Sequence, residues 1–296
     1  MPFTLSHAAA VLPFLRRTGT ARGPLVASAL VAGSFAPDVT YYAATVVPGG
    51  MEFGTVTHSP AGVVTVDVLL SAVLAGGWLL VREPLRALLP RAGWTQPAAV
   101  ARGRPRLPHT ARERALAASW FVVSAVLGAA THVGWDAFTH PGRWGARLLP
   151  VLDTVVAGRP LAMYLQYTTS ALGLAVVGWF LWAASRARRA TGTGGAGLAP
   201  PELPLRLRLS LTAVAALGML LGGGYRTLRA YALHGAAVGW FDYLPDLLFG
   251  AGAGLVPGLL VCAAALRLRN RRARRGTATA DGSAPGRPAG AEAGPA

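Results

Sequence analysis

Two polar residues stand four positions apart near the end of a long apolar run, in the segment ATHVGWDAFTHPGRW (130–144). On a helix, His132 and Asp136 share one face, so both side chains can bind the same ligand. An imidazole and a carboxylate are typical ligands of divalent ions such as Zn²⁺ or Mn²⁺. His140 follows one turn later, before Pro141-Gly142, where a turn can fold its ring back toward the pair. The segment therefore predicts part of a metal site.

Three further groups of the same kinds occur earlier in the chain, and a simple geometric argument brings them together. If residues 3–15 and 24–38 form an antiparallel helical hairpin, His7 and Asp38 lie roughly 16 and 21 Å from its turn, at about 1.5 Å per residue. His58 begins the next apolar run, which returns in the opposite direction. The sequence therefore predicts that the last three polar groups complete a metal site begun by the front half, at one membrane level that collects His7, Asp38, His58, His132, Asp136 and His140.

Each candidate also has a structural interpretation. A histidine near a membrane surface commonly serves as a hydrogen-bonding side chain, and Asp38 after Pro37 can end one helix and cap the next. A carboxylate inside an apolar run is costly, which favours a functional role for Asp136. Asp67 lies roughly 180° from His58 on an ideal helix. We expect it to face elsewhere, as an anchor between helices, a proton carrier or a deeper ligand.

The apolar runs are near the length of roughly 20 residues that a helix needs to span a bilayer. The chain has 296 residues, of which 53% are hydrophobic and 14% are charged. We expect an all-α, polytopic membrane helix bundle with about six spans, after a short apolar N-terminal helix at 3–15 that cannot cross alone. The predicted spans are Pro24–Val47, Pro60–Val81, Ala115–Asp136, Met163–Ser185, Leu207–Gly224 and Leu244–Leu266.

The arginines predict the orientation in the membrane. All 28 basic residues are arginines, and the formal net charge is +16. Connections on the cytoplasmic side carry the excess of basic residues. The sparser side holds only Arg143, Arg147, Arg159, Arg226 and Arg229. We therefore expect a bacterial plasma membrane protein with a cytoplasmic C-terminus, whose arginines contact the anionic inner leaflet and not nucleic acid.

The composition along the chain predicts one membrane domain with polar connections. The expected parts are a helix bundle at 1–269 with the metal site in 1–145, an Arg/Pro-rich cytoplasmic loop at 82–114, a flexible linker at 190–204 and a disordered tail at 270–296. The single cysteine, Cys262, excludes a disulfide or a multi-thiolate zinc site within one chain. Glycines at 222–224 and at 250, 252 and 254 predict close helix packing.

Several motifs resemble known families. The segments MPFTLSHAAAVLPFLRR, LVASALVAGSFAPDVTYY, THS and HVGWDAFTHPGRWG resemble an uncharacterised family of bacterial integral membrane proteins, a domain of unknown function, over the chain to about Arg269. In the front half, the order His, Pro-Asp, Thr-His-Ser, His-x-x-x-Asp also resembles predicted membrane-bound metal-dependent hydrolases and, more distantly, zinc-dependent phospholipases. This second resemblance implies five metal-site candidates: His7, Asp38, His58, His132 and Asp136. Pro-Asp continues here as Val-Thr-Tyr, whereas that pattern often reads Pro-Asp-x-Asp, so one carboxylate is missing.

Two functions are compatible with these residues. The first is a metal-dependent hydrolase of phosphate esters or lipid headgroups near the extracytoplasmic face, in which Asp136 or His140 accepts a proton and Arg143 or Arg147 pairs with phosphate. The alternative is a non-enzymatic membrane protein, either an ion or proton transporter or a structural helix bundle. A transporter needs a path that continues inward, so Asp67 would then matter as much as Asp136.

Overall fold

The computed structural model describes residues 3–88, 109–190, 203–235 and 238–281, which are helical apart from turns and one two-stranded hairpin. Four helices in these ranges are long and apolar enough to cross a membrane: Ala111–Thr139, Leu161–Ala187, Leu205–His234 and Trp240–Arg271. They correspond to the last four predicted spans. A shorter apolar helical segment, Thr4–Phe14, precedes them. The predicted class, an all-α multi-pass membrane protein that contacts a lipid bilayer, is confirmed.

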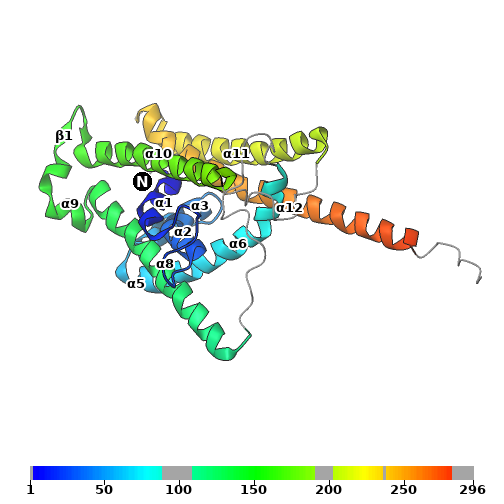
Figure 1. The fold of residues 1–296 in the computed structure, drawn as a ribbon. Helices are drawn as coiled ribbons and strands as arrows, with labels where there is room; N and C mark the ends of the chain where they lie inside the picture. Colours follow the sequence, from blue (N-terminus) through cyan, green and yellow to red (C-terminus); the bar gives the residue numbers. More distant parts are fainter. Residues whose placement is uncertain (1–2, 89–108, 191–202, 236–237, 282–296) are drawn as a thin grey trace, which may run out of the picture.

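The front of the chain is built from short helices. They are η1 (Thr4–His7), α1 (Ala8–Val11), η2 (Leu12–Phe14), α2 (Ala27–Phe35), η3 (Ala36–Asp38), α3 (Val39–Ala43), α4 (Gly50–Thr57) and α5 (Pro60–Val64). The predicted span Pro24–Val47 corresponds to α2, η3 and α3 and is interrupted at Pro37. Pro37 has no N–H to donate to the helical ladder, and the chain tightens there into the 3₁₀ turn η3. In Figure 1 the front helices lie between α8 on one side and α10 with the α11–α12 pair on the other.

The second predicted span, Pro60–Val81, is divided at Thr65. Ser59 caps α5 by accepting a hydrogen bond from the Gly62 N–H, and Pro60 occupies the first helical position. The backbone leaves the helical conformation at Thr65, and α6 (Val66–Leu88) then begins. The direction of a side chain beyond Thr65 therefore cannot be calculated from His58 as if the two lay on one unbroken helix.

The middle of the chain forms two long helices joined by a compact connection. Thr110 and Glu113 form a reciprocal capping box at the start of α8 (Ala111–Thr139). The connection contains α9 (Trp144–Leu148), η4 (Pro150–Asp153) and the antiparallel strands β1 (Val155–Val156) and β2 (Arg159–Pro160). The helix α10 (Leu161–Ala190) follows. Most of the predicted loop 82–114 and linker 190–204 lies outside the described residues.

The back of the chain is a helical hairpin, α11 (Leu205–His234) and α12 (Leu244–Asp281), with η7 (Trp240–Tyr243) before α12. Glycines let the two backbones touch, because a Cβ on Gly222 would overlap the carbonyl oxygen of Gly250, and one on Gly254 would overlap that of Gly218. The predicted glycine packing is thus present. α12 is helical through Asp281, so the first part of the predicted disordered tail, 270–281, is helix; residues 282–296 lie outside the described ranges.

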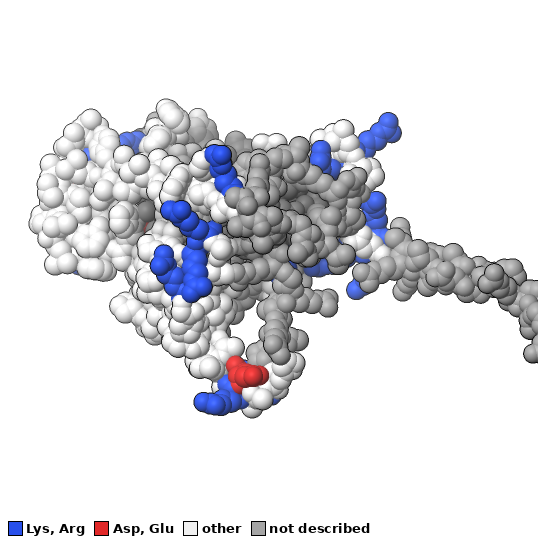
Figure 2. All heavy atoms as spheres, viewed as in Figure 1, with Lys and Arg blue, Asp and Glu red and all other residues white. Residues whose placement is uncertain are grey.

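An ion pair shows that two connections meet at the same end of the bundle. Arg159 of β2 donates two hydrogen bonds, of 2.6 and 3.1 Å, to the carboxylate of Asp242 in η7. The C-terminal end of α8 and the turn of the α11–α12 hairpin therefore face the same way, as the predicted alternation requires. On the face drawn in Figure 2, the end that carries α9 and β1 is almost free of charged side chains.

Glycines also set the distance between α2 and α8, the contact that positions the metal ligands. A Cβ on Gly33 would overlap the carbonyl oxygen of Ala125, and one on Gly128 would overlap that of Leu30. Gly134, also on α8, has open space where its Cβ would lie. The approach of α2 to α8 thus depends on Gly33 and Gly128.

This contrast gives a matched test. We expect Gly128→Ala to destabilise the protein by about 1–3 kcal/mol, because the added methyl group forces α2 away from α8. Gly134→Ala should be neutral or stabilising by up to about 1 kcal/mol, since alanine is the better helix former. Thermal unfolding in detergent would measure both variants. Equal midpoints for the two would contradict the close packing of α2 on α8.

Candidate metal centre

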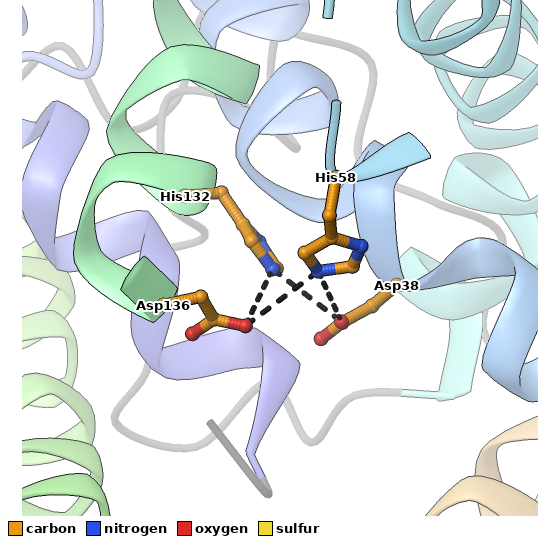
Figure 3. A group of neighbouring side chains, drawn as sticks. All are labelled: Asp38, His58, His132 and Asp136. Atoms are coloured by element: carbon orange, nitrogen blue, oxygen red, sulfur yellow. Dashed lines mark ion pairs between the residues drawn. The ribbon is translucent and has the colours of Figure 1, made fainter. Parts of the chain in front are cut away.

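Four side chains from three separate segments converge at one buried point. Asp38 ends η3, His58 follows the last residue of α4, and His132 and Asp136 lie one turn apart on α8. One ligand atom from each lies within 4.8 Å of all the others. Their side chains are at most 4% exposed. Figure 3 shows the two imidazoles facing the two carboxylates across a common centre.

The distances within this group are compatible with a shared cation. His132 Nε2 lies 3.4 Å from Asp38 Oδ1 and 3.5 Å from Asp136 Oδ2. His58 Nε2 lies 3.8 and 3.6 Å from the same two oxygens. These separations exceed those of N–H···O hydrogen bonds, which are about 2.7–3.2 Å. Ligand atoms at about 2.0–2.2 Å from one ion stand roughly 3.0–3.5 Å apart, depending on its coordination number, so this spacing is compatible with an ion that keeps a position open for a further ligand.

Backbone carbonyls fix the orientation of both histidines. His132 Nδ1 lies 2.7 Å from the carbonyl oxygen of Ser34, and His58 Nδ1 lies 2.9 Å from that of Gly54. A carbonyl oxygen can only accept, so each Nδ1 carries a proton, and each Nε2 is the nitrogen that faces the two carboxylates. Both Nε2 atoms are buried, and neither has a hydrogen-bond partner among the described residues. This is the arrangement of metal-binding histidines, whose second nitrogen donates to an outer partner.

Local structure around the proline break positions Asp38. The hydroxyl of Thr57 donates to the carbonyl oxygen of Pro37 at 2.8 Å, which ties the end of α4 to η3. The hydroxyl of Thr4 donates to Asp38 Oδ2 at 2.5 Å. Asp38 Oδ1 is the oxygen that faces the histidines. Thr4 therefore holds Oδ2 of Asp38, and Oδ1 is left to face the histidines.

His7 lies beside the four-residue group. Its ring stacks on that of His132, with centroids 3.5 Å apart and planes inclined by 10°. Its Nε2 is 3.5 Å from Asp136 Oδ1, the oxygen that does not face His58 and His132. His7 is thus close to the centre, as the sequence predicted, but it faces the outer side of Asp136.

His140, just past the end of α8, is held by two neighbours. Its Nδ1 lies 3.2 Å from the carbonyl oxygen of Asp136, and the side-chain amide of Gln166 lies 3.1 Å from its Nε2. These contacts fit a neutral ring that donates from Nδ1 and accepts at Nε2. Burial lowers the pKa of His140 to about 4, although the Asp136 carboxylate opposes this shift. His140 is therefore neutral at pH 7 and stands next to a ligand.

The two candidate phosphate-binding arginines have different surroundings. Arg143 is half-buried, and its charge acts on both His140 and Tyr41. Arg147, one turn further along α9, is exposed. The structure thus brings Arg143, and not Arg147, to the border of the metal centre.

Asp67 is buried, and both of its carboxylate oxygens lack a hydrogen-bond partner among the described residues. Its charge interacts with His132 and Asp38. The sequence argument placed it away from His58, but the break at Thr65 means that the angle counted from His58 along one ideal helix does not give the direction of Asp67.

Thr4, Tyr41 and Gln166 were not among the candidate residues. Thr4 and Tyr41 lie inside two of the segments that resemble the membrane family, but neither has a spacing that indicates a role, and Gln166 lies outside those segments. Pro37 was the visible signal, because its position before Asp38 marks the backbone break that places the carboxylate.

The fold and the site define a class: a multi-pass helical membrane protein with a buried group of two aspartates and two histidines that could bind a metal ion. The model of one family, described as a domain of unknown function (DUF4184), matches residues 1–264, so the chain belongs to that family. This confirms the resemblance to an uncharacterised membrane family. Comparisons with curated proteins and with solved structures found no match.

The hydroxyl of Thr4 offers a test of the centre that leaves its four ligands intact. We expect Thr4→Val to weaken Zn²⁺ affinity about 10–100-fold, because Asp38 loses the partner that orients it. Thr55→Val is the control, since the Thr55 hydroxyl donates to the Glu52 carbonyl on an exposed face of α4. Competition with a fluorescent zinc chelator would measure both affinities. Equal affinities would show that the Thr4 hydroxyl does not support the centre.

Proposed function

We propose that this protein is a membrane-embedded, metal-dependent hydrolase of phosphate esters or lipid headgroups. The orientation of His58 and His132 carries the proposal. Each ring donates from Nδ1 to a backbone carbonyl and directs a buried, unpartnered Nε2 at two carboxylates. A site that served only to join helices would be expected to pair these nitrogens directly.

The donor set suits a divalent ion of intermediate hardness. Two imidazoles and two carboxylates favour Zn²⁺ or Mn²⁺ over ions that prefer thiolates. Asp38, His58, His132 and Asp136 would hold the ion, and His7 would orient Asp136 from its outer side. When bound, the ion supplies Lewis-acid activation of water and of a phosphate oxygen.

The remaining chemistry falls to residues at the border of the centre. His140 is neutral and adjacent to Asp136, so it is placed to take up a proton at Nε2, the nitrogen that faces Gln166. Asp136 Oδ1, which faces His7, is a second acceptor. Arg143 supplies a positive charge for a phosphate oxygen.

The arginine distribution supports an orientation for this site. The connection after α8, which contains α9 and the two hairpin strands, is poor in arginines. The positive-inside rule assigns such a connection to the extracytoplasmic side. Asp136 lies near that end of α8. We therefore infer a plasma membrane protein with a cytoplasmic C-terminus and a site that opens toward the outer leaflet, where phosphate-bearing headgroups lie.

One observation favours a second candidate, an ion or proton transporter. Asp67 is a buried carboxylate on α6 whose oxygens have no hydrogen-bond partner among the described residues, and intramembrane carboxylates are common along proton and ion paths. A transporter would depend on Asp67 as strongly as on Asp136. A hydrolase needs no path beyond the metal centre.

Metal content tests the proposal directly. We expect detergent-purified protein, prepared without chelators, to carry about one Zn²⁺ or Mn²⁺ per chain by mass spectrometry. His58→Ala and Asp136→Ala should each lose most of it, because each removes a ligand. His234→Ala is the control, since His234 is exposed at the end of α11.

Two results would contradict the hydrolase. The first is a wild-type protein that stays free of metal after reloading with Zn²⁺ and Mn²⁺. The second is a metal-loaded protein that hydrolyses no phosphomonoester or phospholipid but moves protons across liposomes in an Asp67-dependent manner. That second result would establish the transporter instead.

A further inference from the structure

Tyr41 occupies a fixed position against the metal centre. It lies on α3, three residues after Asp38, and its ring stacks on His58 with centroids 5.5 Å apart. The edge of Phe249 from α12 closes another side at 5.6 Å. A Cβ on Gly54 would overlap the Tyr41 ring, so this glycine leaves the space that the phenol fills. Tyr41 therefore cannot move without disturbing His58.

A buried arginine holds the backbone of Tyr41. Arg226 of α11 donates from Nη1 to the carbonyl oxygen of Tyr41 and, at 3.3 Å, to the hydroxyl of Thr45. Its Nε donates to Asp246 Oδ1 at 2.9 Å, which neutralises the charge. Arg226 is thus a positioning residue, because its donors and its charge are used within the protein.

Arg143 differs from Arg226 in this respect. The turn after α8, with Gly142 at φ +74°, reverses the chain and brings Arg143 back beside His140. The guanidinium interacts with the Tyr41 phenol and with the His140 ring. Within the described part of the chain it forms no ion pair with a carboxylate, whereas Arg159 and Arg226 each have one. Arg143 therefore offers a charge and several donors at the edge of the centre.

We propose that Arg143 and the Tyr41 hydroxyl form an anion-binding pair that takes the phosphate group of the substrate. A guanidinium presents planar, paired N–H donors that match two phosphate oxygens, and a phenol adds a third donor at a fixed position. The pair borders His58 and His140, so a phosphate bound there lies against the metal centre. This inference rests on the proposed function, because it names the substrate group of the same site.

Phosphate binding can be measured without turnover, which separates the two proposals. The probe is inorganic phosphate, titrated calorimetrically into detergent-purified full-length protein, with acetate as the control anion. We expect Arg143→Gln to weaken phosphate binding about 10–100-fold, the usual effect of losing a charged hydrogen-bonding group. Tyr41→Phe should weaken it about 3–10-fold for one neutral donor. Arg147→Gln, the matched control on the exposed side of α9, should bind as the wild type does.

Metal content measured on the same samples keeps the outcomes distinct. Unchanged metal with phosphate binding lost in Arg143→Gln supports the anion-binding pair. No phosphate binding by the wild type, equal binding of acetate, or an equal loss in Arg147→Gln would overturn it. If phosphate binding depends on Arg143 in a protein that never takes up metal, the anion-binding pair is supported and the metal-dependent hydrolase is contradicted.

The source of the phosphate group is resolved by two further probes. Glycerol 3-phosphate represents soluble esters, and mixed micelles with phosphatidic acid represent lipid headgroups, with diacylglycerol micelles as the blank. Binding that depends on Arg143 with either probe supports the pair and identifies the source. If both probes bind Arg143→Gln and Tyr41→Phe as tightly as the wild type, the anion-binding pair is contradicted.

Discussion

Two carboxylates, Asp38 and Asp136, face one point inside a membrane protein, and the front half is arranged around that constraint. Like charges at such a distance in a medium of low polarity repel strongly and must be offset by positive charge. His58 and His132 direct their Nε2 atoms at these oxygens, so either protonated imidazoles or a cation that the group could bind would supply that charge. The proline break, the glycine contacts and the Thr4 hydroxyl all serve to hold these oxygens in place.

The sequence predicted the four grouped residues because their signals are local or depend on simple geometry. His132 and Asp136 share a helical face, and Asp38 follows a proline, so residue type and spacing were sufficient. The short front helices were not predictable, because an apolar run looks the same whether or not its backbone is interrupted. Thr65 shows the consequence: the break in the helix there invalidates the angle counted from His58 to Asp67. Gln166 reaches the centre only through tertiary packing, which no pattern in one chain encodes, and Tyr41, although it lies three residues after Asp38, has no motif that distinguishes it from the other tyrosines.

The back half contributes to the site without providing a ligand. The α11–α12 hairpin packs through glycines, so its two helices form a firm pair. Arg226 and Phe249 then connect this pair to Tyr41, whose ring lies against His58. Gly252 makes room for Tyr42 next to the same contact. Arg226, which looked like a cation in an external connection, is therefore a link between the two halves.

The bond between His132 and the carbonyl of Ser34 joins residues 98 positions apart in the chain. During synthesis, α2 and Asp38 therefore leave the ribosome well before the helix that completes their surroundings. The interrupted front helices carry unpaired polar groups that lipid does not tolerate, so they must remain near water or the insertion machinery until α8 arrives. The surroundings of Asp38 are thus incomplete until α8 has been made and packs against α2.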